Sequence, residues 1–113
     1  MVDKNKVLGI IETDDTFKPM EHNGEKVWQG KCIFCNKKIY VSESGQPYNN
    51  VSIEHIIPRS KGGTEDIQNL ALACVSCNNE KGIRHDTKKS NKARAKEIIT
   101  MLQNKRMERW KKK

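Results

Sequence analysis

Four cysteines form two closely spaced pairs that could bind a metal ion. Two residues separate Cys32 from Cys35, and two residues separate Cys74 from Cys77. Two such pairs are a typical ligand set for tetrahedral zinc, because the turn inside each pair directs both thiolates to one ion. Four protein ligands leave no open position for water, so we expect this zinc to stabilise the fold rather than to catalyse a reaction.

The segment between the two pairs contains residue types that could catalyse hydrolysis. Residues 52–70 read SIEHIIPRSKGGTEDIQNL, and residues 77–82 continue as CNNEKG. The acid–His dipeptide, the Pro and Gly-Gly loop, the Asn-Leu pair and the Cys-Asn-x-x-Lys-Gly run resemble the HNH nuclease family over residues 32–82. The resemblance implies a ββα-metal fold that holds one divalent ion against the scissile phosphate.

The resemblance also implies roles for four residues. His55 matches the general base of the family, and Glu54 before it matches a metal ligand. Asn69 matches the central asparagine, which braces the loop that holds the base, and Asn78 matches the second metal ligand. The family most often has Asp where this chain has Glu54, and the additional methylene displaces the carboxylate.

The chemistry of these side chains agrees with the implied roles. An imidazole can accept a proton from water near neutral pH. The oxygens of Glu54 and Asn78 suit Mg2+ or Mn2+, and such an ion would neutralise charge on the phosphate and on the leaving oxygen. Four basic residues flank the proposed site and could bind phosphates: Arg59, Lys61, Lys81 and Arg84.

The elements expected to position these residues form a small α+β fold. The sequence predicts a hairpin that carries the first cysteine pair, a strand over residues 51–57 and a further strand over residues 69–74, since β-branched and apolar residues dominate these segments. A short helix should follow and end at Gly82. We place this nuclease core at residues 27–86.

Two further regions flank the core. Residues 1–26 contain one short apolar run, Val7 to Ile11, which we interpret as a strand followed by a loop. Residues 87–113 predict a long helix from Ser90 that packs on the same domain. Its apolar side chains recur at helical spacing: Ala95, Ile98, Ile99 and Leu102.

Positive charge is concentrated in this last region. Residues 87–113 contain eleven Lys and Arg but only two Glu, a net charge of +9, whereas all 113 residues together carry +8. Such a stretch favours nucleic acid as a partner, because basic side chains that neutralise phosphates release condensed counterions. The alternative is a solvated helix face. We expect the basic side chains of this helix to face solvent or a phosphate backbone.

The remaining composition limits the class of protein. No apolar run approaches the roughly 20 residues that a membrane span needs, and the first residues lack the features of a signal peptide. We therefore expect no membrane partner and a cytoplasmic protein of prokaryotic or phage-like type. Hydrophobic residues make up 35% of the chain, which is a thin supply for a core and makes a metal staple useful.

The sequence as a whole predicts an endonuclease that hydrolyses DNA with a divalent ion. One alternative is a catalytically inactive zinc module that binds nucleic acid. Another is a nuclease subunit that docks on a phage packaging or restriction complex through its C-terminal helix. RNA as the substrate and the oligomeric state stay open. Trp28, Tyr40 and Tyr48 are too scattered in the sequence to predict a platform for base stacking.

Overall fold

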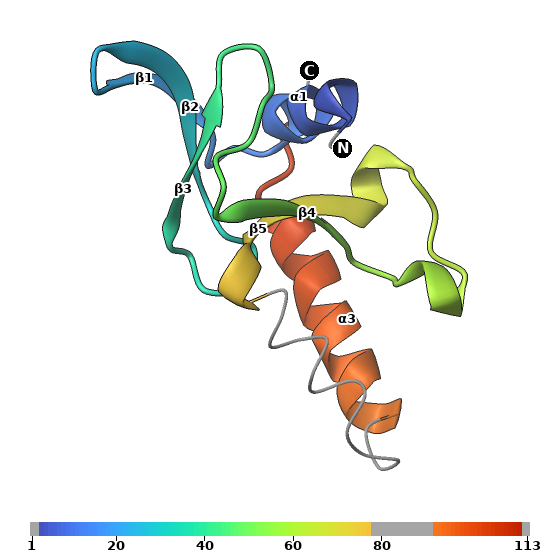
Figure 1. Ribbon diagram of the computed structural model, residues 1–113. Helices are drawn as coiled ribbons and strands as arrows, with labels where there is room; N and C mark the ends of the chain where they lie inside the picture. The colour runs from blue at the N-terminus through green and yellow to red at the C-terminus, as the bar shows by residue number, and fades with distance from the viewer. Residues whose placement is uncertain (1–2, 78–91, 112–113) are drawn as a thin grey trace.

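Two small antiparallel sheets lie at the centre of the fold (Figure 1). The computed structural model describes residues 3–77 and 92–111. The first sheet has the order β1-β2-β3, with strands at Lys18–His22, Glu25–Lys31 and Lys38–Ser42. The second sheet pairs β4 (Val51–His55) with β5 (Leu70–Cys74). These strands, with the C-terminal helix and the cysteine cluster described below, confirm the predicted α+β fold class.

Helices precede and follow the sheets. Helix α1 spans Lys4–Thr13 and helix α3 spans Lys92–Glu108, while two short 3-10 turns, η1 at Arg59–Lys61 and η2 at Ile67–Asn69, lie between β4 and β5. Residues 75–77 are helical directly after β5, as predicted, and the rest of the expected short helix lies outside the described residues. No helix in the described part of the chain is long and apolar enough to cross a membrane.

The strand predicted at Val7 to Ile11 is wrong, because this run forms the buried face of α1. The side chain of Asp3 caps the helix by accepting hydrogen bonds from the backbone N–H groups of Asn5, at 2.9 Å, and Lys6, at 3.3 Å. Val7, Ile10 and Ile11 are buried and follow the i, i+3, i+4 spacing of one helical face.

The loop predicted after this run is also wrong in part. Strand β1 pairs with β2 along its whole length. The two-residue turn between them, Asn23-Gly24, has positive φ at both positions (53° and 80°), as a tight hairpin turn requires. Pro19 is tolerated because β1 is an edge strand, where a missing N–H donor does not interrupt the sheet.

The β4–β5 sheet places its two ends in different surroundings. The register pairs Val51 with Cys74 at one end and His55 with Leu70 at the other. Four residue steps of about 3.3 Å separate the two ends by roughly 13 Å. The second cysteine pair therefore begins at one end of the sheet, and His55 lies at the opposite end.

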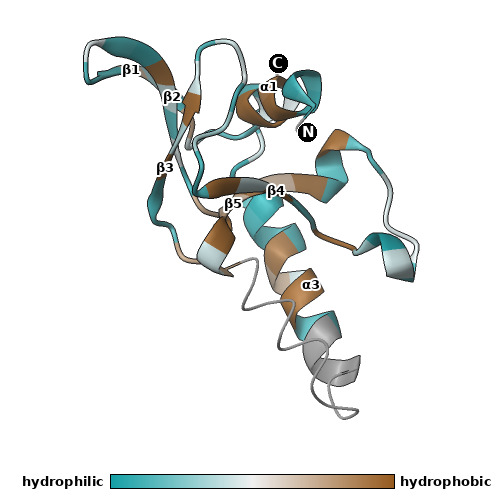
Figure 2. Ribbon diagram, viewed as in Figure 1, coloured by the Kyte–Doolittle hydropathy of each residue, from teal (hydrophilic) through white to brown (hydrophobic). Residues whose placement is uncertain are grey.

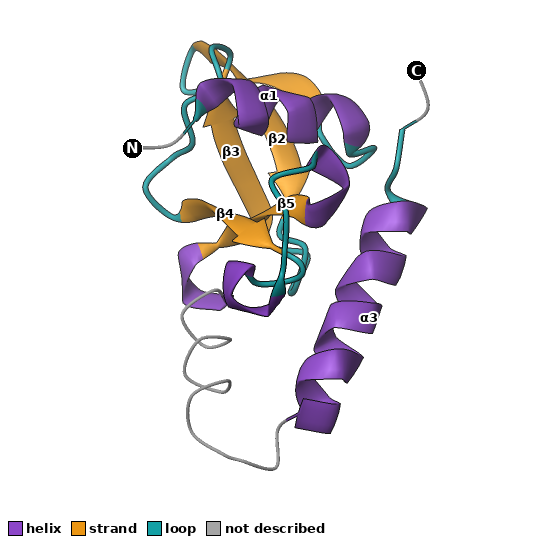
Figure 3. Ribbon diagram, turned by 90° about the vertical axis from the view of Figure 1, so that its right-hand side faces the viewer, coloured by secondary structure: helices purple, strands orange, loops and turns teal. Residues whose placement is uncertain are grey.

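Helix α3 packs beside this sheet through its middle and last turns (Figure 3). Figure 2 shows hydrophobic residues concentrated on α1, on β5 and in the middle of α3. In α3, Leu102 is buried and Ile98 and Ile99 are half-buried against the core, which confirms that part of the predicted apolar stripe. The side chain of Ala95 is not among those described. The chain after α3 returns to α1, where Asp14 and Trp110 form an isolated β-bridge.

Candidate functional site

The four cysteines lie together at one end of the β4–β5 sheet. The turn between β2 and β3 carries Cys32 and Cys35, while Cys74 ends β5 and Cys77 belongs to the helical residues that follow. Their sulfur atoms all lie within 4.8 Å of one another. A tetrahedral zinc site with Zn–S bonds of about 2.3 Å has S–S edges of about 3.8 Å. The Sγ atoms of Cys35 and Cys74 are 3.8 Å apart, so the residues present fit a structural metal ion such as zinc.

Backbone amides direct hydrogen bonds to these sulfur atoms. The N–H groups of Phe34 and Cys74 donate to Cys32 Sγ, at 3.4 and 3.3 Å. The backbone N–H of Lys37 lowers the pKa of Cys35 to about 7, whereas burial raises the pKa of Cys32. The amides favour thiolates and burial opposes them, so four thiolates at this position need a cation to offset their charge.

Basic side chains in the last turn of α3 and directly after it hold the first cysteine turn in place. Arg109 donates to the carbonyl oxygens of Lys31, at 3.0 Å, and Cys32, at 3.3 Å. Lys105 donates to the carbonyl oxygen of Phe34 at 3.0 Å. The expectation that the basic residues of this helix face solvent or phosphate is therefore wrong for both of these side chains, because each is used inside the fold.

Arg106 departs even further from that expectation, since its side chain is fully buried at 2% exposure. Its guanidinium donates to the carbonyl oxygens of Leu70, at 2.8 Å, and Thr13, at 3.0 Å, and to Thr13 Oγ1 at 2.7 Å. It also lies 4.8 Å from the centre of the Trp110 ring. Burial lowers the pKa of Arg106, and the nearby Asp14 carboxylate opposes that shift. The group joins β5, α1 and α3.

The acid–His dipeptide lies at the other end of the sheet, in the last two positions of β4. Alternation along the strand directs the two side chains to opposite faces. The side chain of Glu54 is buried at 5% exposure, beside Ala71 of β5. The side chain of His55 is 22% exposed. A buried carboxylate one residue from a partly exposed imidazole is a suitable oxygen donor for a hard cation.

The loop after β4 is held by Asn69. Its side-chain oxygen accepts a hydrogen bond from the backbone N–H of Ile57 at 2.8 Å. Its side-chain nitrogen donates to the carbonyl oxygens of Ile57, at 3.1 Å, and Thr64, at 2.9 Å. One carboxamide thus joins the beginning, the far side and the end of the loop that follows His55.

Each residue of the Gly-Gly pair in this loop must be glycine for a different steric reason. Gly62 has φ of 88°, in the left-handed region, where it ends η1. A Cβ atom on Gly63 would lie 1.7 Å from the carbonyl oxygen of Ile57, which no side chain can accommodate. Gly63 also donates its N–H to the carbonyl oxygen of Pro58 at 3.0 Å. The two glycines therefore allow the loop to fold back on the end of β4.

A cluster of charged side chains surrounds the imidazole. Glu65 Oε2 lies 2.6 Å from His55 Nε2. Arg59 donates from Nε to Glu65 Oε2 at 3.1 Å and from Nη2 to Oε1 at 3.0 Å, and Lys6 of α1 donates to Oε1 at 2.6 Å. The contact with Arg59 and then those with Lys6 and His55 lower the pKa of Glu65 to about 2, so this carboxylate is ionised at neutral pH.

The predicted residues are distributed as follows. The structure brings Glu54, His55, Asn69 and Arg59 to one end of the β4–β5 sheet. Lys61 is exposed on η1. Three predicted residues lie outside the described part of the chain: Asn78, Lys81 and Arg84. Sequence reasoning missed Glu65 and Lys6, because a contact between residues 59 positions apart has no local signature.

Two aromatic side chains lie closer together than their sequence positions indicated. Tyr40 and Tyr48 have ring centres 5.9 Å apart, and His22 stacks on Tyr40 with ring centres 4.4 Å apart. Tyr40 and Tyr48 are therefore neighbours in the fold, which their sequence positions alone did not indicate. All three rings are half-buried beside the β1-β2-β3 sheet, where they pack against one another.

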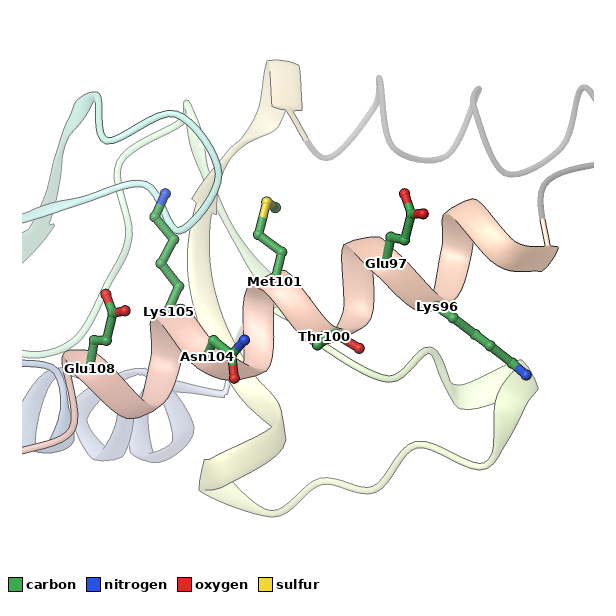
Figure 4. Close-up of a pocket in the computed structure, with 7 residues that line it drawn as sticks. All are labelled: Lys96, Glu97, Thr100, Met101, Asn104, Lys105 and Glu108. Atoms are coloured by element: carbon green, nitrogen blue, oxygen red, sulfur yellow. The ribbon is translucent and has the colours of Figure 1, made fainter.

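Two hollows lie along α3, and neither is lined by His55 or by a cysteine. An open surface hollow of about 670 Å3 follows one face of α3 between Lys96 and Glu108 (Figure 4). An open groove of about 750 Å3 lies between α3 and the loop over residues 57–69. The groove borders the candidate site, because Asn69 is among its lining residues.

Comparisons with known proteins give one match. The family model described as HNH endonuclease matches residues 32–84, from the first cysteine to just beyond the second pair. No curated protein and no solved structure matches the chain.

Proposed function

We propose, from the match of residues 32–84 to the HNH endonuclease family model, that the chain hydrolyses DNA phosphodiester bonds with His55 as the general base. The observation that carries the proposal is the position of His55. It is partly exposed at the end of a short rigid strand, beside a loop that Asn69 holds by three hydrogen bonds. A base must be reachable by water and fixed in orientation, and this arrangement supplies both.

The cysteine cluster has a separate task in this proposal. Zinc bound by Cys32, Cys35, Cys74 and Cys77 would have a complete ligand shell and would hold the β2–β3 turn against the end of β5. It would contribute to folding and supply no water for the reaction.

A second divalent ion, Mg2+ or Mn2+, would bind at Glu54, separately from the zinc. Glu54 and Asn78 would hold it through oxygen atoms, with substrate phosphate and water completing the shell. When bound, such an ion neutralises charge on the phosphate and on the departing oxygen. The burial of Glu54 supports this role, because a carboxylate taken out of water is stabilised by a cation.

The reaction proceeds by attack of water on phosphorus. His55 accepts one proton of the water as its oxygen forms a new bond to phosphorus. The bond from phosphorus to the 3′ oxygen breaks, leaving a 5′ phosphate and, after protonation by solvent, a 3′ hydroxyl. Arg59 and Lys61 contribute positive charge near the path of the phosphate backbone.

Plasmid nicking tests this proposal. His55→Ala should abolish nicking that depends on Mg2+ or Mn2+, while zinc content and the circular dichroism spectrum stay those of the wild type. His22→Ala is the matched control, since it removes a histidine beside the other sheet.

Undiminished nicking by the His55 variant would overturn the assignment of the base. Binding of DNA that survives EDTA, with no cleavage at any divalent ion tested, would instead identify a binding module. An RNA oligonucleotide in the same assay distinguishes the two nucleic acids as substrates.

A further inference from the structure

We infer that Glu65 is a positioning residue for the general base, and that Lys6 and Arg59 hold Glu65 in place. This inference rests on the proposed function, because it concerns how His55 is presented to water. It extends the reacting centre beyond the matched residues 32–84, since Lys6 belongs to α1.

The contact between Glu65 and His55 defines which ring nitrogen carries the proton. Glu65 is ionised, and its Oε2 lies 2.6 Å from His55 Nε2. Two lone pairs cannot face each other at that distance, so Nε2 must carry hydrogen and donate it. Arg59 Nε lies 3.4 Å from the same Nε2 but 3.1 Å from Glu65 Oε2, so its single hydrogen goes to the carboxylate.

The tautomer with hydrogen on Nε2 has its lone pair on Nδ1. The water proton therefore goes to Nδ1 while the Nε2 hydrogen stays between the ring and Glu65. The imidazolium that results has its positive charge beside a carboxylate, which stabilises it. No proton needs to move to Glu65, so the carboxylate is unchanged at the end of the step.

Glu65 is itself fixed from two directions. Arg59 binds both of its oxygens in a bidentate pair, and Lys6 binds Oε1 from α1. The carboxylate therefore has a donor at each oxygen in addition to His55, although it is partly exposed at 39%. A group held by two cations from different elements can orient a ring in a way that a free surface carboxylate cannot.

The same two cations solve an electrostatic problem. A lone carboxylate beside the base would repel an approaching phosphodiester. Lys6 and Arg59 carry two positive charges against the one negative charge of Glu65, so the cluster as a whole remains attractive to phosphate. The cluster can thus orient the base without excluding the substrate.

Steady-state nicking kinetics test the inference. Glu65→Gln should lower kcat by about 10- to 100-fold and change KM for DNA by less than about twofold, because it removes orientation and charge rather than a substrate contact. Lys6→Met should lower kcat by a smaller factor, and Lys6→Arg should restore it. Glu43→Gln, at an exposed position after β3, is the matched control and should behave as the wild type.

A spectroscopic readout that needs no activity completes the test. Nitrogen-15 NMR of the wild type at alkaline pH, where imidazole is neutral, should show His55 in the tautomer protonated at Nε2, and Glu65→Gln should show a mixture.

Full or faster nicking by Glu65→Gln, beside an inactive His55→Ala, would overturn the positioning role and leave the proposed function intact. A rise in KM with unchanged kcat would do the same. Equal nicking by the wild type and His55→Ala would instead contradict the proposed function. The NMR measurement would still test whether Glu65 accepts a hydrogen bond from His55.

Discussion

The two ends of the β4–β5 sheet differ in burial, charge and hydrogen bonding. At the end marked by Val51 and Cys74, the cysteines meet, and Lys105 of α3 and Arg109 directly after it donate to backbone carbonyl groups. At the end marked by His55 and Leu70, an exposed loop carries ionised groups that contact one another at the surface. One end is built mainly from buried or metal-binding groups, and the other from partly exposed charged groups.

Together with the proposed function, this difference leads us to expect that stability and chemistry depend on separate parts of a very small fold. The paired strands β4 and β5 join the two ends, and all five residues of β5 are buried. Changes at the cysteine end should therefore alter the amount of folded protein, whereas changes at the His55 end should alter the activity of each folded molecule. The predictions below test this division.

Loss of a cysteine should have the largest effect. Cys74→Ser removes one of the two buried cysteines of the cluster, and we expect the variant to lose stoichiometric zinc and most of its folded structure at room temperature. Metal analysis and circular dichroism measure both. Ser76→Ala, at the exposed position between the second pair, should retain metal and fold. A folded, zinc-free Cys74 variant that nicks DNA would break the division.

Removal of the buried Arg106 guanidinium should reduce stability substantially, but less than the loss of a cysteine. Arg106→Met leaves the carbonyl oxygens of Leu70 and Thr13 without this donor, and we expect a loss of about 2–4 kcal/mol in the free energy of unfolding. Urea denaturation measures it. Lys96→Met removes the same charge from an exposed position of α3 and should change stability by less than about 0.5 kcal/mol. Weaker DNA binding by the folded Arg106 variant, beyond that of Lys96→Met, would show that the helix does contact phosphate.

Asn69→Ala should reduce activity more than stability, unlike Arg106→Met. It removes the three side-chain hydrogen bonds of the loop, so we expect a stability loss of about 1–3 kcal/mol together with a fall in kcat of about 10- to 100-fold. Asn69→Asp keeps the acceptor for Ile57 N–H and loses both donors, so its kcat should lie between that of the wild type and that of Asn69→Ala. Normal kcat per folded molecule in both variants would remove the loop from the mechanism.

The smallest effect is expected at the exposed end of η1. Lys61→Ala should leave stability unchanged and weaken DNA binding similarly for all DNA sequences. The slope of the logarithm of the binding constant against the logarithm of the salt concentration should fall in magnitude by about one. Fluorescence anisotropy at several salt concentrations measures it. Lys38→Ala, in the exposed part of β3, is the control. An equal loss of binding in both variants would place the DNA over a much wider surface.

Sequence reasoning succeeded where short spacing carries the information. Two pairs with fixed spacing predicted the metal cluster, because each turn needs only four residues to direct its thiolates. The alternation over residues 51–57 predicted β4, and the apolar stretch over residues 69–74 predicted β5. The division into a core and two flanking regions remains a prediction.

The wrong predictions concern segments whose conformation and side-chain contacts depend on packing against residues distant in the sequence. A run of β-branched residues at Val7 to Ile11 favours a strand, yet the Asp3 cap and the i, i+3, i+4 spacing were the better signals. The charge of Arg106 and Arg109 gave no indication that carbonyl groups from distant segments would bind them. The contact of Lys6 with Glu65 likewise depends on where α1 packs.

The cysteine cluster has a consequence for the order of folding. Cys35 and Cys74 are 39 positions apart, so a metal ion bound to both closes a loop that contains Glu54, His55 and Asn69. Chain-entropy arguments developed for disulfides apply here. Closing a loop of this length reduces the entropy of the unfolded chain and so raises its free energy by about 4 kcal/mol at room temperature. A metal ion captured by the cysteines would therefore act as a reversible cross-link on the unfolded chain. Refolding with metal present should be faster than refolding with metal added afterwards, because β4 and β5 then search for each other inside a closed ring.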